Sequence, residues 1–198
     1  MSESNKPGMN SLSLLRFAVI IVLLTWFAIE LHEMGHFVVY TLAGYHARMS
    51  LQRVTPSADV PALLDHWAKL AGPAVSLIAA TVFLLIARAQ PGFTLVTASF
   101  TNASLRLFPC AMDLLKAFKG KAPFSDEGEV VMAITSNRAG RVSLLLVAIA
   151  LSAVLTVLAG REYPFQRRRL LKCLLIYGLS LAVGIGVVLL DEIMGWSQ

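Results

Sequence analysis

Long apolar runs are the feature of this 198-residue chain that most constrains what it can fold into. The runs cover residues 17–29, 70–86, 142–159 and 173–190, and a less apolar fifth segment covers 93–108. A helix of about 18 to 20 apolar residues is long enough to cross the hydrocarbon core of a bilayer. The pattern therefore predicts an all-α polytopic membrane protein with about five transmembrane helices.

Composition supports the same class of protein. Hydrophobic residues make up 57% of the sequence and charged residues 15%, whereas a soluble domain usually carries about 25% charged residues. A soluble enzyme, a nucleic-acid-binding module and a disordered tail are therefore excluded. The net charge of +5 is expected to lie in loops that orient the helices, so no nucleic-acid partner is predicted. Two cysteines, Cys110 and Cys173, are too few for a disulfide framework.

The sequence divides into three parts. A polar N-terminal tail at 1–11 precedes a membrane core at 12–137, and two additional C-terminal transmembrane helices follow within 138–198. A basic loop at 161–169 joins those two helices, and the positive-inside rule predicts that it is cytoplasmic. With five crossings, this puts the N-terminus inside and the C-terminus outside.

Residues 93–137 of the membrane core are less apolar than the long runs. Hydroxyl and amide side chains share faces of the predicted helix 93–108, which indicates that this helix faces the bundle interior or a wet cavity. The stretch from Pro109 to Ser125 is expected to be irregular, and a re-entrant or broken element is expected between Pro109 and Asp126. A short helix is predicted from Asp126 to Asn137, with Ser125 as its N-cap.

His32-Glu33-Met34-Gly35-His36 forms an H-E-x-x-H motif on the first predicted helix. The two histidines lie one turn apart on one face, so both imidazoles can reach a single metal ion. Zn²⁺ with two histidines and a third protein ligand keeps one position for water, whose pKa falls to about 7. Glu33 is then the natural general base for that water and a later proton donor to a leaving amine.

Other interpretations of the motif are a set of interhelical hydrogen bonds, a haem-binding pair, or part of the path of a transported ion. Glu30, one turn before Glu33, is expected either to support the site or to pair with a basic group. The third ligand must come from another part of the chain. The remaining candidates are few: Asp59, Asp65, Asp113, Asp126, Glu127, Glu129, Glu162, His46 and His66.

An H-E-x-x-H motif on a long hydrophobic helix resembles the site-two protease family of intramembrane zinc metalloproteases. Two further segments are similar to that family. AGPAVS at 71–76 resembles its A-G-P-x-x-N segment, and LRLFP at 105–109 with PFSDEG at 123–128 resembles its N-x-x-P…D-G element. The resemblance covers about residues 15–137, so it implies a metalloprotease-like core, and no PDZ or CBS module is present.

The family resemblance implies a ligand set of His32, His36 and an aspartate of the D-G element. Asp126 is the preferred third ligand, because it starts a predicted helix and precedes a glycine, and Asp113 is the alternative. The family's asparagine in N-x-x-P, which is associated with substrate or oxyanion binding, is replaced here by Arg106. Asn102, one turn earlier, or Arg106 itself is expected to take over that contact.

Two other departures from the family pattern are evident. Ser76 replaces an asparagine, and Glu127 is inserted between the aspartate and the glycine. The family also has a β-hairpin after the first helix, which pairs with an unwound substrate by strand addition. Partial alternation from Arg48 to Val54 fits a short strand there.

The sequence thus predicts a zinc-dependent endopeptidase that hydrolyses membrane-anchored protein substrates within the bilayer. The expected location is a prokaryotic cytoplasmic membrane, as a multi-pass protein. Two alternatives belong to other classes. One is a catalytically inactive metalloprotease-like scaffold or chaperone, and the other is a metal transporter or redox subunit of the membrane.

Overall fold

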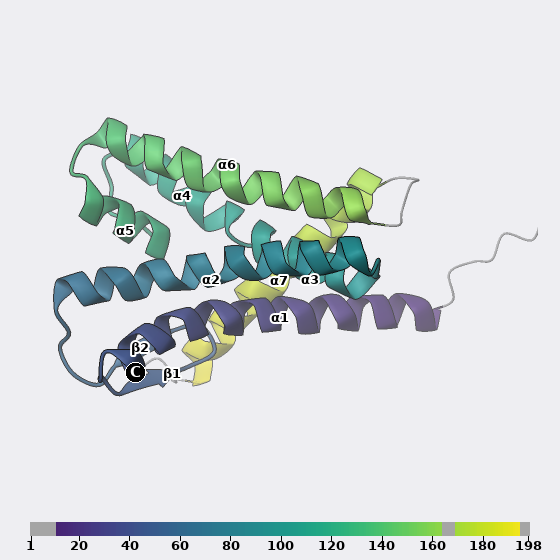
Figure 1. Ribbon diagram of the computed structural model, residues 1–198, viewed down its shortest axis with the longest axis horizontal. Coiled ribbons are helices and arrows are strands. Elements are labelled where there is room, and N and C mark those ends of the chain that lie inside the picture. The colour runs from purple at the N-terminus through teal and green to yellow at the C-terminus, as the bar shows by residue number, and fades with distance from the viewer. Residues whose placement is uncertain (1–10, 164–168, 195–198) are drawn as a thin grey trace, which may run out of the picture.

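The computed structural model describes residues 11–163 and 169–194. These residues form seven helices and one hairpin (Figure 1): α1 Ser11–Leu42, β1 Ala47–Met49, β2 Val54–Pro56, α2 Ala62–Ala89, α3 Phe93–Ser104, α4 Leu107–Phe118, α5 Asp126–Ile134, α6 Arg138–Glu162 and α7 Arg169–Met194. The polar tail expected at 1–11 lies outside the described residues except for Ser11. The basic loop expected at 161–169 also lies largely outside them.

Four of the helices in the described part of the chain, α1, α2, α6 and α7, are long and apolar enough to cross a membrane. Most residues of their apolar windows are not buried within the protein, as expected for surfaces that face lipid. The prediction of an all-α polytopic membrane protein is confirmed.

The fifth predicted span is a pair of shorter helices rather than one continuous helix. α3 ends at Ser104, and α4 begins at Leu107. In Figure 1, α3 lies beside α2 and α4 lies beside α6, and together they return the chain along the bundle. The break falls just before Pro109, so the expected broken element exists but starts earlier in the chain.

The expectation of irregular structure from Pro109 to Ser125 is wrong for most of that stretch. α4 continues to Phe118, and only the connection from Lys119 to Ser125 is non-helical. Pro109 lies in the first turn of α4, where a proline needs no hydrogen-bond donor and is tolerated. The proline therefore begins a helix instead of interrupting one.

The polar face of α3 is buried, as the sequence pattern predicts. Thr97, Ser99, Thr101, Asn102 and Ser104 are each no more than 1% exposed. Most of their polar groups are satisfied by nearby carbonyl oxygens, as in the 2.7 Å hydrogen bond from the Ser99 hydroxyl to Ala80. Small polar side chains thus allow α3 to pack closely in the centre of the bundle.

An apolar core around Phe100 and Tyr163 joins α3 to the ends of α2 and α6. The Tyr163 hydroxyl donates to Thr97 over 3.1 Å, so the core includes one buried polar contact. α7 crosses the bundle obliquely (Figure 1) and is fixed to α1 by a buried hydrogen bond of 3.0 Å from Thr25 to Ser180.

The predicted β-hairpin after the first helix is present, but the strand expected from Arg48 to Val54 is not continuous, because residues 50–53 form the turn. β1 and β2 are antiparallel, with Arg48 opposite Thr55. The turn between the strands is fixed to α7, because Asp191 accepts hydrogen bonds of 3.3 Å from the Ser50 hydroxyl and the Leu51 backbone N–H. The hairpin therefore lies at the same end of the bundle as the C-terminal end of α7.

Candidate metal centre

His32, Glu33 and His36 are buried on the inward face of α1, each no more than 6% exposed. The Nε2 atoms of the two histidines are 3.1 Å apart. Oδ2 of Asp126, at the start of α5, lies 3.2 Å from Nε2 of His32 and 3.3 Å from Nε2 of His36. The structure thus brings the first predicted ligand pair together with the preferred third residue, 90 positions beyond His36.

These three atoms form a nearly equilateral triangle. A tetrahedral ion with bonds of about 2.0 to 2.1 Å would have ligand atoms about 3.3 to 3.4 Å apart. Two imidazole nitrogens and one carboxylate oxygen are also a donor set that Zn²⁺ accepts, with one position left for water. The geometry and the chemistry of this triad therefore fit a catalytic type of zinc site.

Backbone and hydroxyl groups orient the two histidine rings. Nδ1 of His36 donates to the carbonyl oxygen of Ala68 over 2.7 Å, and the hydroxyl of Ser76 lies 3.3 Å from Nδ1 of His32. Because their Nδ1 atoms are engaged in this way, both rings direct Nε2 at the triangle. Ser76 therefore contacts the site even though it is smaller than the asparagine of the family pattern.

α1 and α2 approach each other closely at two glycines. A Cβ at Gly35 would lie 2.6 Å from the carbonyl oxygen of Ala71, and a Cβ at Gly72 would lie 2.4 Å from Nε2 of His36. Only glycine leaves room for the helices and the imidazoles at these positions. This close approach explains the role of the small residues in the 71–76 segment.

Asp126 is held by the N-terminal turn of α5. Ser125 is the N-cap predicted from the sequence, and its hydroxyl accepts from the Gly128 N–H. Burial raises the pKa of the Asp126 carboxyl, but hydrogen bonds from His32 and His36 outweigh this effect and hold the pKa well below its usual range. Asp126 is therefore a carboxylate at neutral pH, as a metal ligand must be.

Asp113, the alternative third ligand, is directed away from the triangle. Its carboxylate is 2% exposed and accepts hydrogen bonds from the backbone N–H groups of Phe124 and Ser125. The neighbouring Cys110 is not part of the triad either: among the described residues, the donor atoms that lie together are those of His32, His36 and Asp126. Asp113 instead fixes the loop that carries Asp126.

The two glutamates of the motif region have different surroundings. Glu33 is buried beside the triad, and its Oε2 atom has no hydrogen-bond partner among the described residues. A buried carboxylate oxygen without a protein partner is costly, and its position beside the triad fits a site that binds a further group. Glu30 accepts a 2.8 Å hydrogen bond from the Trp26 indole at the protein surface, so it neither supports the triad nor pairs with a basic group.

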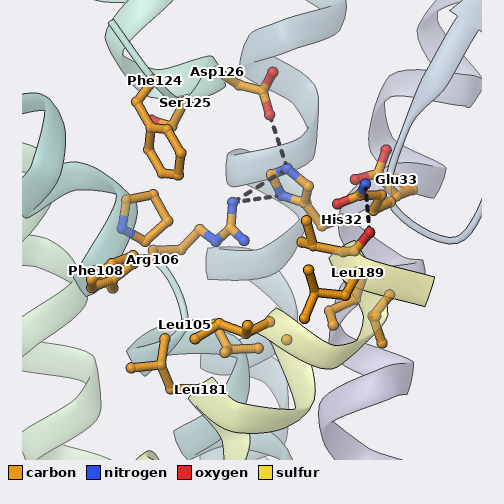
Figure 2. A pocket seen from close by; sticks show the side chains of 17 residues that line it. His32, Glu33, Leu105, Arg106, Phe108, Phe124, Ser125, Asp126, Leu181 and Leu189 are labelled. Atoms are coloured by element: carbon orange, nitrogen blue, oxygen red, sulfur yellow. Dashed lines mark hydrogen bonds and ion pairs between the residues drawn. The ribbon is translucent and has the colours of Figure 1, made fainter. Parts of the chain in front are cut away.

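Two chambers meet at Glu33 and Asp126. An apolar chamber of about 350 Å³ extends between α1, the α3–α4 break and α7 (Figure 2). A polar chamber of about 470 Å³ lies between the end of α1, the hairpin and the starts of α2 and α5. The triad is therefore accessible from an apolar side and from a polar side.

A hydrogen-bonded network lines the polar chamber. Lys69 forms ion pairs of 2.7 Å with Asp65 and 2.5 Å with Glu129, and the Tyr40 hydroxyl donates to Asp65 over 2.6 Å. The network joins α1, α2 and α5 around the triad. The sequence offers an i, i+4 spacing for Asp65 and Lys69, but nothing in it indicates that Glu129 lies next to them.

The two predicted substrate-binding residues have different positions. Arg106 lines the apolar chamber, and its Nη1 atom lies 3.2 Å from both ring nitrogens of His32. Asn102 is 1% exposed, donates to the Ala98 carbonyl oxygen of its own helix, and does not line either chamber. Arg106 therefore lies at the wall of the apolar chamber, whereas Asn102 lies inside the bundle.

Comparison of the chain with protein-family models, curated proteins and solved structures found no match.

Proposed function

We propose that this membrane protein is a zinc-dependent endopeptidase that hydrolyses membrane-anchored protein substrates in or near their transmembrane segments. The observation that carries the proposal is the buried triangle of His32, His36 and Asp126 with the unpartnered carboxylate of Glu33 beside it. The similarity of the motifs to site-two proteases supports the same reaction. A prokaryotic cytoplasmic membrane is the proposed location.

His32, His36 and Asp126 would hold the ion, which supplies a Lewis acid that polarises a carbonyl group and makes water acidic. Glu33 takes a proton from water as the water oxygen adds to the carbonyl carbon of the scissile bond. When the C–N bond breaks, Glu33 returns that proton to the amine. The buried surroundings keep Glu33 close to the reacting atoms.

The two chambers suggest how a substrate is accommodated. The apolar chamber suits hydrophobic side chains of an unwound transmembrane segment, and the polar chamber suits the entry of water and the polar flank of the substrate. β2 lines the polar chamber, so its free edge is available to an extended substrate strand. Such pairing satisfies the substrate backbone when its helix opens.

Glu33→Gln tests this function because it removes the base while keeping a side chain of the same shape. We expect Glu33→Gln to bind zinc like the wild type and to accumulate uncleaved membrane proteins in cells, detected by comparing membrane proteomes. His32→Ala should lose both zinc and cleavage. Identical membrane protein profiles in wild-type and Glu33→Gln cells would contradict the proposal.

One observation favours a non-catalytic scaffold as the second candidate. The guanidinium of Arg106 lies beside His32, and a cation at that position opposes the binding of a second cation. A scaffold would use the triad for stability and would tolerate Glu33→Gln, while His32→Ala would still impair it. The same two variants therefore distinguish the scaffold from the endopeptidase.

A further inference from the structure

Arg106 is the one lysine or arginine among the described residues that line the apolar chamber. The side chain is 15% exposed, and its Nε atom is buried with no hydrogen-bond partner in the part of the chain that the structure describes. Figure 2 shows the guanidinium on one side of His32 and Glu33 on the other. A charged group with an unused donor thus lies across the candidate metal centre from the proposed base.

Glu127 is the counter-ion of this arginine. Its Oε1 atom lies 3.5 Å from Nη1 of Arg106, and its side chain is 9% exposed. Neither carboxylate oxygen accepts a hydrogen bond from residues 11–163 or 169–194. Arg106 comes from the α3–α4 break, whereas Glu127 follows Asp126 in the first turn of α5. The two departures from the family's N-x-x-P…D-G pattern are therefore in contact with each other.

Burial of this ion pair costs free energy that packing alone does not recover. Two ions removed from water lose several kcal/mol of hydration each, and a single contact of 3.5 Å returns only part of that loss. The unused donor of Arg106 and the unused acceptors of Glu127 show that the pair is not saturated by the protein. The guanidinium of Arg106 lines the apolar chamber, where it is placed to donate to an anionic oxygen of a ligand.

We propose that Arg106 and Glu127 act as one anion-binding unit of the candidate site. Arg106 donates to the oxygen of the scissile carbonyl as that oxygen becomes negative, and Glu127 is a positioning residue that holds the guanidinium at the chamber wall. This inference rests on the proposed endopeptidase function. It adds a role for Glu127 and gives the arginine a function that an asparagine would perform without a charge.

Arg106 acts while water adds to the scissile carbonyl group. The water oxygen forms a bond to the carbonyl carbon and gives one proton to Glu33, and the π electron pair of the carbonyl moves onto its oxygen. Arg106 donates a hydrogen bond to the resulting oxyanion and transfers no proton. The electron pair then re-forms the C=O bond, the C–N bond breaks, and the amine nitrogen takes the proton from Glu33. Donors placed where negative charge develops contribute about 100- to 1000-fold to the rate in other hydrolases.

Two binding measurements on purified protein in detergent test the unit without needing turnover. One is the affinity for Zn²⁺, and the other is the affinity of the zinc-loaded protein for a leucine phosphinate dipeptide, which mimics the anionic tetrahedral state. Arg106→Gln should bind zinc several-fold more tightly, because a nearby positive charge is removed, and should bind the phosphinate at least 10-fold more weakly. A pair that serves only the fold would lower both affinities.

Glu127→Gln completes a double-mutant cycle. Alone, it should weaken phosphinate binding, but it should add no further loss in the Arg106→Gln background, because Glu127 acts through Arg106. Arg106→Lys keeps the charge and should recover part of the affinity. Arg141→Gln is the control, since Arg141 on α6 also has a buried Nε atom without a partner but lines neither chamber.

The outcomes separate this inference from the proposed function. A wild-type protein that binds no zinc would overturn both. Tight phosphinate binding that is unchanged in Arg106→Gln, or losses that simply add in the double variant, would overturn the anion-binding unit and leave the endopeptidase proposal standing. Thermal unfolding of each variant, measured in the same detergent, identifies any loss that is caused by unfolding.

Discussion

Asp113 accepts two hydrogen bonds from Ser125, one from its backbone N–H at 3.0 Å and one from its hydroxyl at 2.5 Å. Ser125 immediately precedes Asp126, so this contact determines where α5 begins and where its first carboxylate lies. Gly128 packs over the same carboxylate, since a Cβ there would lie 2.3 Å from Oδ2 of Asp113. Asp113 thus supports the candidate metal centre from α4.

We expect Asp113→Ala to act on stability and Asp126→Ala on metal binding. Removal of the Asp113 carboxylate leaves three donors unsatisfied, and each costs about 1–3 kcal/mol when buried. Asp113→Ala should therefore lower the unfolding temperature but keep measurable zinc affinity. Asp126→Ala should change the unfolding temperature of the metal-free protein much less. Equal zinc affinity losses in the two variants would contradict this division of roles.

Gly72→Ala should displace the histidine rings. Its new methyl group would lie 2.4 Å from Nε2 of His36 and 2.8 Å from Cε1 of His32, so the rings must move out of the ligand triangle. We expect zinc affinity to fall at least 10-fold in an isothermal titration. Gly178→Ala on α7 is the matched control, because no atom lies within 4 Å of its new Cβ. A Gly72→Ala protein with wild-type zinc affinity would show that the close approach is not needed.

Val54→Pro tests the free edge of the hairpin. The Ser50 N–H donates to the Arg53 carbonyl oxygen, and the Ser57 N–H donates to the His46 carbonyl oxygen. In an antiparallel ladder, hydrogen-bonded and non-hydrogen-bonded residue pairs alternate. The pair of Met49 and Val54 is therefore non-hydrogen-bonded, and the Val54 backbone groups point away from β1. Proline there removes an outward N–H donor without removing a β1–β2 hydrogen bond.

We expect Val54→Pro to reduce cleavage of membrane-anchored proteins in cells several-fold while zinc affinity stays unchanged. Val54→Ala keeps the N–H and should cleave normally. If Val54→Pro loses zinc as well as cleavage, the hairpin serves the stability of the site rather than the binding of a substrate strand.

Asp191→Ala should release the end of α7 from the hairpin turn. Asp191 is fully buried and accepts from Ser50 and Leu51, so its loss leaves two groups without their partner. We expect faster hydrogen exchange in the turn and in the last two turns of α7, with zinc affinity preserved. Unchanged exchange in both segments would mean that other contacts hold them together.

Local patterns allowed several parts of the structure to be predicted. The apolar runs predict the four long helices, because a bilayer requires a minimum length of apolar helix. The H-E-x-x-H spacing predicts that His32 and His36 share a face, since this depends only on helix geometry. Ser125 and the acidic first turn of α5 also form a signal that needs no tertiary information.

Features that depend on distant contacts were harder to predict. The choice of Asp126 over Asp113 depended on a resemblance, because no local signal shows which carboxylate the loop directs at the histidines. The sequence predicts irregular structure from Pro109 onward, whereas Pro109 lies in the first turn of α4, where a proline is compatible with a helix. The contact of Arg106 with Glu127 joins residues from two elements, and only the fold brings them together.

The most direct test of the account is the zinc content per chain of purified wild-type protein and Asp126→Ala, measured by inductively coupled plasma mass spectrometry after purification without added metal. We predict about one zinc per chain in the wild type and almost none in Asp126→Ala, with the same helical content by circular dichroism. Equal zinc in the two proteins, or a well-folded wild type that takes up no zinc when it is supplied, would contradict the assignment of His32, His36 and Asp126 as a metal centre.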